Sequence, residues 1–121
     1  MFPSEGEVLE AYAAVSTALG LPTRVSAAGV RVALAGAEQL AEDVYEGPAA
    51  VLFAFARVPR AFAAPRTMTV LLTLAQADAS GQHLAATPRE LAAWADGAAR
   101  GGLTYEEVRA HLAERLFPFG G

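Results

Sequence analysis

The sequence predicts a single all-α domain, a compact bundle of about six to seven helices with two apolar helices at its centre. Capping signals mark helix starts near both ends of the chain, and two middle segments are apolar nearly all round. The outer segments carry apolar residues at the 3.6-residue spacing of a one-sided helix. No stretch alternates polar and apolar residues for long enough to indicate a sheet.

The first helix is predicted from about Glu5 to Leu19. Ser4 and Glu7 have the spacing of a capping box, in which each side chain accepts a hydrogen bond from the other residue's backbone N–H. Gly20 is typical of a helix end, and Pro22 just beyond it cannot continue the helix.

The middle of the chain predicts one peripheral and two central helices. A helix is predicted to begin near Ser26, and Gly29–Val44 fits either one helix or two short helices broken around Gly36. The next segments, Pro48–Arg57 and Arg66–Ala79, are predicted to be the central helices because both are apolar on nearly every side.

Two one-sided helices are predicted at the end of the chain, where they form part of an outer shell. Thr87 with Glu90, and Thr104 with Glu107, repeat the capping-box spacing. Pro88 also suits the first helical position, because its missing N–H would have no partner there.

Predictions also concern two short segments, the C-terminal tail and two single residues. Either Arg24–Val25 or Gln82–Leu84 could form a short extended piece, and the apolar tail Phe117–Phe119 either folds back on the domain or contacts another chain. Trp94 has the spacing of a packing residue, and His111 is expected on the surface.

Length and composition exclude several classes of function. A chain of 121 residues fits one domain, 1–121, and no apolar run reaches the roughly 18 to 20 residues of a membrane span. We therefore expect a cytoplasmic protein that does not bind membranes. The net charge of −4 makes nucleic acid a poor partner, and the sequence has no Cys and no metal-type spacing of its two His residues.

Short stretches along the chain follow the order seen in one known family. They are Gly20–Pro22, Ser26–Gly29 and Ala33–Leu34 near the start, and Gly81–Leu84, Thr87–Ala92 and Ala99–Val108 near the end. Together they resemble the death-on-curing (Doc) branch of the Fic family over nearly the whole chain. The resemblance implies a Fic/Doc-like helical domain, with the family's active-site motif in the loop between the central helices.

That motif has the form His-x-Phe-x-Asp/Asn-Gly/Ala-Asn-Lys-Arg in the family. When Ala56-Arg57 and Gly81 are kept in register without a gap, its positions are occupied in turn by Pro59, Ala61, Ala63, Ala64, Pro65, Arg66 and Thr67. A shift of one residue would instead put Val58 at the position of the His. The histidine is missing in either register.

The resemblance therefore implies a protein without the family's transferase activity. In the family the His serves as general base and the acidic residue helps to hold a metal on nucleotide phosphates. Neither Pro59 nor Ala63 can replace them. We expect no catalytic residue, metal site or cofactor, and a catalytically degenerate relative of bacterial toxins that binds an antitoxin-like protein or forms a homodimer.

Two alternatives to this function stay open. One is a divergent Fic/Doc-type transferase, the toxin of a toxin–antitoxin pair, whose acid or base comes from Asp78 or His83. The other is a structural subunit of a homo-oligomer, whose apolar surface a second copy covers.

Three arginines flank the loop that would hold phosphates in the family, and they could retain weak binding of phosphate or a nucleotide. Arg57, Arg60 and Arg66 lie close together in the sequence, and guanidinium groups bind phosphate in a bidentate way. The alternative is that they are solvated or paired with an acidic residue, the candidates being Glu42, Asp43, Glu46 and Asp78.

Overall fold

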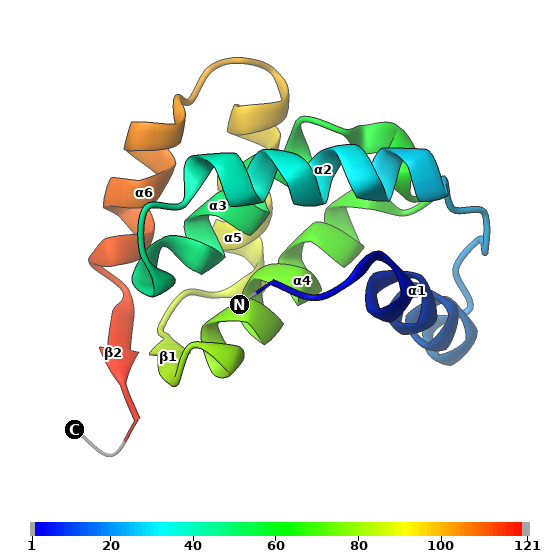
Figure 1. Ribbon diagram of the computed structural model, residues 1–121, viewed down its shortest axis with the longest axis horizontal. Coiled ribbons are helices and arrows are strands. Elements are labelled where there is room, and N and C mark those ends of the chain that lie inside the picture. Colours follow the sequence, from blue (N-terminus) through cyan, green and yellow to red (C-terminus); the bar gives the residue numbers. More distant parts are fainter. Residues whose placement is uncertain (1, 120–121) are drawn as a thin grey trace.

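Capping residues and prolines set most of the helix starts in residues 2–119, the part of the chain that the structure describes. In the computed structural model the α-helices are α1 (Glu5–Leu19), α2 (Ala27–Leu40), α3 (Gly47–Ala56), α4 (Pro65–Ala79), α5 (Pro88–Ala99) and α6 (Tyr105–Ala113). Two 3-10 turns, η1 (Val44–Glu46) and η2 (Pro59–Ala61), and two strands, β1 (Gln82–Leu84) and β2 (Leu116–Pro118), complete the fold. The predicted all-α class is confirmed (Figure 1).

All three predicted capping boxes form. At the start of α1 the Ser4 N–H donates to Glu7 Oε1 over 2.8 Å, and the Glu7 N–H donates to Ser4 Oγ over 3.1 Å. The same reciprocal pairs open α5 at Thr87 and α6 at Thr104. The helix α1 also ends at Gly20, as predicted, where the backbone turns left-handed with a φ of 65°.

The helix α2 is continuous through Gly36, so the reading with two short helices is wrong. It ends at Leu40 and does not reach Val44. Asp43 is the physical reason, because its Oδ1 accepts the N–H groups of Tyr45 and Glu46 and thereby starts the separate turn η1.

The helix α3 occupies the centre, as predicted. Every one of its residues except Phe53 is buried, and it packs against α2, α4, α5 and α6. The helix α4 is less enclosed than its composition predicts, because Leu71 on its outer face is 37% exposed. Figure 1 shows α3 and α4 in the middle of the molecule, with α1 and α6 at opposite ends of the view.

The core consists mainly of two apolar clusters that meet at α3. One joins α3 to α1 and α2 and includes Tyr12, Val30 and Phe55. The other joins α3 to α5 and α6 and includes Leu52, Leu91 and Leu112. Because α3 contributes to both, both of its ends are held in place, and the loop that leaves its C-terminal end starts from a rigid support.

Both of the segments considered for extended structure make strand contacts. Gln82–Leu84 forms β1 and pairs antiparallel with β2, whereas Val25 forms an isolated bridge with Phe62. The apolar tail therefore folds back on the domain through its backbone, although the rings of Phe117 and Phe119 stay 52% and 54% exposed. Within residues 2–119, no helix is both long and apolar enough to cross a membrane.

Candidate functional site

The loop between α3 and α4, residues 57–64, is tied down along its length. Ala61 O accepts the Ser26 N–H over 2.8 Å, and the Ala63 N–H donates to Arg24 O over 2.9 Å. The Ala64 N–H donates to the hydroxyl oxygen of Tyr12 over 3.1 Å. Backbone donors and acceptors of the loop are thus paired with α1 and with the segment before α2.

Tyr12 is the main anchor of this loop. Its side chain is fully buried, its ring lies 5.0 Å from the ring of Phe62, and its hydroxyl donates to Pro22 O over 2.6 Å. One side chain of α1 therefore holds both the turn after α1 and the residue before α4. Sequence reasoning missed this role, because a Tyr at core spacing gives no signal for a partner 52 residues away.

The buried part of the loop belongs to the core. Val58, Ala61 and Phe62 are all buried, and the ring of Phe62 stacks on Phe55 with centroids 5.8 Å apart. Ala61 lies directly against Gly29 of α2, where even an added Cβ would be 3.0 Å from the Ala61 Cα. This half of the loop therefore has no room for a ligand.

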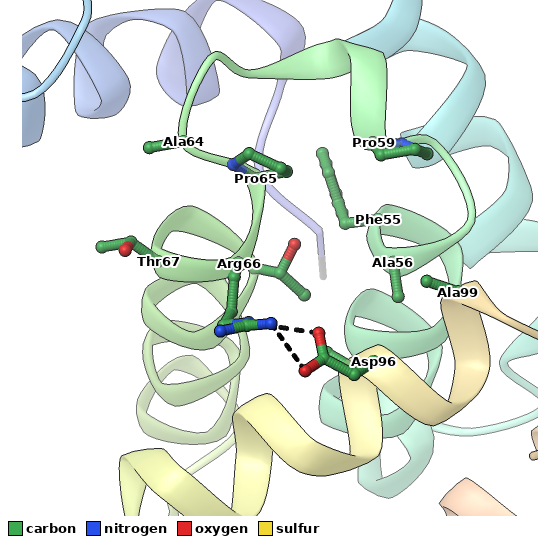
Figure 2. Close-up of a pocket in the computed structure, with 11 residues that line it drawn as sticks. Phe55, Ala56, Pro59, Ala64, Pro65, Arg66, Thr67, Asp96 and Ala99 are labelled. Carbon is green, nitrogen blue, oxygen red and sulfur yellow. Dashed lines mark hydrogen bonds and ion pairs between the residues drawn. The ribbon is translucent and has the colours of Figure 1, made fainter.

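The exposed part of the loop borders a pocket of about 360 Å³ between the end of α3, the start of α4 and α5. Figure 2 shows Pro59, Phe55 and Pro65 around it, with Arg66 and Asp96 on one side. The lining is mostly apolar, and its residues are Phe55, Ala56, Pro59, Ala64, Pro65, Arg66, Thr67, Thr69, Ala95, Asp96 and Ala99.

Most of the residues aligned above with the motif positions meet at this pocket. Pro59, Ala64, Pro65, Arg66 and Thr67 line it. The two others lie elsewhere, because Ala61 is buried against Gly29, and Ala63 is half-buried outside the lining.

Arg66 and Asp96 form a two-pronged ion pair at the edge of the pocket. Arg66 Nε lies 3.1 Å from Asp96 Oδ1, and Arg66 Nη2 lies 2.7 Å from Asp96 Oδ2. The side chains are 64% and 33% exposed, so the pair contributes only about 0.2–1 kcal/mol to stability. The pair matters more for anion binding, because the Asp96 carboxylate already binds the guanidinium that a phosphate would need.

The three arginines considered for anion binding do not converge on one point. Arg57 Nη1 donates to Ala98 O over 3.3 Å at the C-terminal end of α5, where a positive charge is favourable. Arg60 is exposed and makes no hydrogen bond or ion pair with residues 2–119. Arg66 binds Asp96, so the predicted pairing with Glu42, Asp43, Glu46 or Asp78 is wrong for this residue.

The first turn of α4 presents free backbone donors next to Arg66. Ala64 at the N-cap has no side-chain oxygen, and Pro65 has no N–H. The N–H groups of Arg66 and Thr67 find no acceptor in the described chain. Such groups favour an anion, but the Arg66 side chain beside them is already bound to Asp96.

Asp78 and His83 are far from this pocket. Asp78 follows Arg66 by twelve residues on the same helix, which separates their Cα atoms by about 18 Å. His83 lies beyond that end, in β1. Asp96 is the acidic residue that the fold brings to the pocket. Sequence reasoning missed it, because it lies on the side of α5 away from the apolar face formed by Leu91, Ala95 and Ala98.

His111 and Trp94 also lie together, on α6 and α5. Their rings stack with centroids 5.2 Å apart, and the guanidinium of Arg115 lies 5.7 Å from the Trp94 ring centroid. His111 is exposed, as predicted. These contacts join the two outer helices, and none of the three residues lines the pocket at the loop. In the described residues, no group of three or more acidic, His or Cys side chains could hold a metal ion.

Comparison with known proteins adds no closer identification. No protein-family model matches the chain, and no curated protein matches its sequence. Membership of the Fic/Doc family therefore remains an inference from the stretches and motif positions described above.

Proposed function

We propose that this chain is a catalytically degenerate Fic/Doc-like protein that acts by binding a partner, without phosphotransferase or AMP-transferase activity. The observation that carries the proposal is the lining of the pocket beside the loop. Its titratable side chains are those of Arg66 and Asp96, and each is bound to the other. At the position of the family's general base the pocket has Pro59.

The chemistry of transfer needs more than this pocket supplies. A hydroxyl nucleophile requires a group that accepts its proton, and a nucleotide requires a metal ligand and donors for its phosphates. The carboxylate of Asp96 is already bound to Arg66, and the position of the metal-holding acid is occupied by Ala63, outside the lining. Since Pro59 lines the pocket and Val58 is buried, the arrangement favours the register without a gap.

The proposed role is in the cytoplasm, with an antitoxin-like protein or a second copy as the partner. The pocket itself suits an apolar side chain better than a nucleotide, because proline, alanine and phenylalanine form most of its wall. Phosphate binding is expected to be weak, since any anion at the start of α4 competes with Asp96 for Arg66.

Incubation of the protein with labelled ATP and Mg²⁺, with a translation factor or a cell lysate as acceptor, tests the loss of activity. We expect no transfer above background, and none from Pro59→His, because such groups act as a unit and the positions of the acid and the Asn are also lost. Transfer by the unaltered protein, abolished by Asp96→Ala, would replace this proposal with that of a divergent transferase.

Titration with inorganic phosphate tests what remains of the anion site. Following the amide shifts of Ala64, Arg66 and Thr67, we expect little response in the unaltered protein and a clear millimolar response in Asp96→Asn, which leaves Arg66 free. No response in the variant would show that the arrangement no longer recognises phosphate. Sedimentation over a wide range of protein concentration separates a homodimer from a monomer that needs another partner.

A further inference from the structure

A second pocket, of about 390 Å³, lies at the other end of the two central helices. It is bordered by η1, by the start of α3, by α6 and by both strands. The lining residues are Asp43, Tyr45, Glu46, Ala49, Gln82, Arg109, Ala110, Leu112, Ala113 and Leu116. None of them is a position of the active-site motif or lines the first pocket, so this pocket is separate from the site at the loop.

Gln82 is the unusual member of this lining. It faces inward from β1, with only 9% of its surface exposed. Its Oε1 is buried and accepts no hydrogen bond from the described residues. Buried polar atoms are nearly always paired, and an unpaired carbonyl oxygen destabilises the protein unless something outside the chain supplies a donor.

Glu46 provides a second acceptor in the same pocket. Its side chain is 11% exposed, and its Oε1 accepts the hydroxyl of Tyr105 over 2.8 Å. Burial, together with this bond to Glu46, raises the pKa of Tyr105, so the hydroxyl remains a donor. The other oxygen, Oε2, lies 4.0 Å from Arg109 Nη1, which is beyond hydrogen-bond distance.

The balance of charge in the pocket is negative. Asp43 and Glu46 each carry a negative charge, and Arg109 carries the positive charge of the lining. That guanidinium is also bound by Glu106, so its charge is largely offset already. The Asp43 Oδ1 accepts two backbone N–H groups and keeps the carboxylate at the pocket. A ligand that donates hydrogen bonds and carries a positive charge would complement this set.

We propose that this second pocket binds a small organic amine. The ammonium group donates to Gln82 Oε1 and to the carboxylates of Glu46 and Asp43. The carbon chain of the amine lies against the apolar part of the wall, at Leu112 and Leu116. A primary ammonium fits because its three donors match three acceptors that the protein leaves partly or wholly unpaired.

The test uses n-butylammonium as the probe, with n-butanol and butyrate as probes of similar size that lack the positive charge. Amide shifts of Ala49, Gln82 and Ala110 are followed while each probe is added to the whole protein. We expect saturable shifts with butylammonium, with a dissociation constant on the order of 1 mM, and no saturation with the other two. No saturation with butylammonium, or equal saturation with butanol, would overturn the proposal.

Two variants separate binding from folding. Gln82→Leu removes the unpaired oxygen, so the melting temperature should stay the same or rise while the affinity for butylammonium falls about tenfold. Glu46→Gln keeps an acceptor for Tyr105 but removes the charge, and a similar loss is expected. Gln39→Leu and Glu38→Gln, at exposed positions of α2, are the matched controls and should bind like the unaltered protein. Unchanged affinity in both pocket variants would make Gln82 a structural residue only.

Discussion

Two glycines of α2 should respond in different ways to the same substitution. In Gly36→Ala the new Cβ would have Ala54 Cβ at 3.6 Å as its nearest neighbour, an ordinary contact. In Gly29→Ala the new Cβ would lie 3.0 Å from the Cα of Ala61 and 3.3 Å from its Cβ and N. The first position has room for a methyl group, whereas the second does not.

The expected magnitudes follow from two separate contributions. Replacement of Gly by Ala inside a helix stabilises it by about 0.8–1 kcal/mol, with less gain near a helix start such as Gly29. Overpacking costs about 1–3 kcal/mol where the neighbour cannot move. Ala61 cannot move easily, because its carbonyl accepts the Ser26 N–H and its own N–H donates to Val58 O. We therefore expect Gly36→Ala to gain up to about 1 kcal/mol, and Gly29→Ala to lose about 1–2 kcal/mol.

Urea unfolding followed by circular dichroism at 222 nm measures both free energies of unfolding in one experiment. The difference between the two variants is the informative quantity, since most of the helix-propensity gain is common to both. Equal stability of Gly29→Ala and Gly36→Ala would refute the close packing of the loop on α2. In Gly29→Ala we also expect the amide resonances of Ala61 and of the residues on either side of Pro59 to shift, because the loop must move to accommodate the methyl group.

Two further predictions concern the anchor of the loop and the response to acid. Tyr12→Phe keeps the ring but leaves Pro22 O and the Ala64 N–H without their partner, so the free energy of unfolding should fall by about 2 kcal/mol. The Ala64 amide should also exchange faster with solvent, and unchanged exchange would contradict the anchoring role. The side-chain hydrogen bond from Arg115, followed by that from the Thr87 backbone, lowers the pKa of Glu90 from 4.5 to about 2. Because the folded pKa is the lower one, this carboxylate stabilises the fold above pH 4.5, and the contribution disappears as the pH falls toward 2. Glu90→Gln should therefore show a smaller fall in melting temperature over that range, and an identical fall would count against the Arg115 contact.

The helix starts could be predicted from the sequence because their causes are local. Ser4, Thr87 and Thr104 each form hydrogen bonds with a residue three positions later, so both partners can be read from one short stretch of sequence. The central place of α3 was predictable for a related reason. A segment that is apolar on every side has no stable position except inside other helices.

The candidate sites were harder to predict from the sequence, because their contacts join segments that lie far apart in the chain. The ion pair between Arg66 and Asp96 spans 30 residues, and the bond between Tyr12 and Ala64 spans 52. Charge and spacing gave several acidic residues as possible partners for Arg66, and only the packing of α5 beside α4 selects Asp96. The exposed face of α4 at Leu71 was missed because composition does not say how many neighbours a helix receives.

Contacts outside any catalytic role hold the loop between α3 and α4 in place, which bears on the Fic/Doc relationship proposed above. Ala61 and Phe62 fill the core, and Arg57 contacts α5 while Ala64 contacts α1. These interactions use apolar side chains, the Arg57 guanidinium, the Tyr12 hydroxyl and backbone groups, and none of them needs a base or a metal ligand at the loop. The energetic reason to keep the loop ordered is therefore independent of catalysis. The proposed binding function needs only this ordered surface, so under that proposal a loop without the family's histidine can keep its structure.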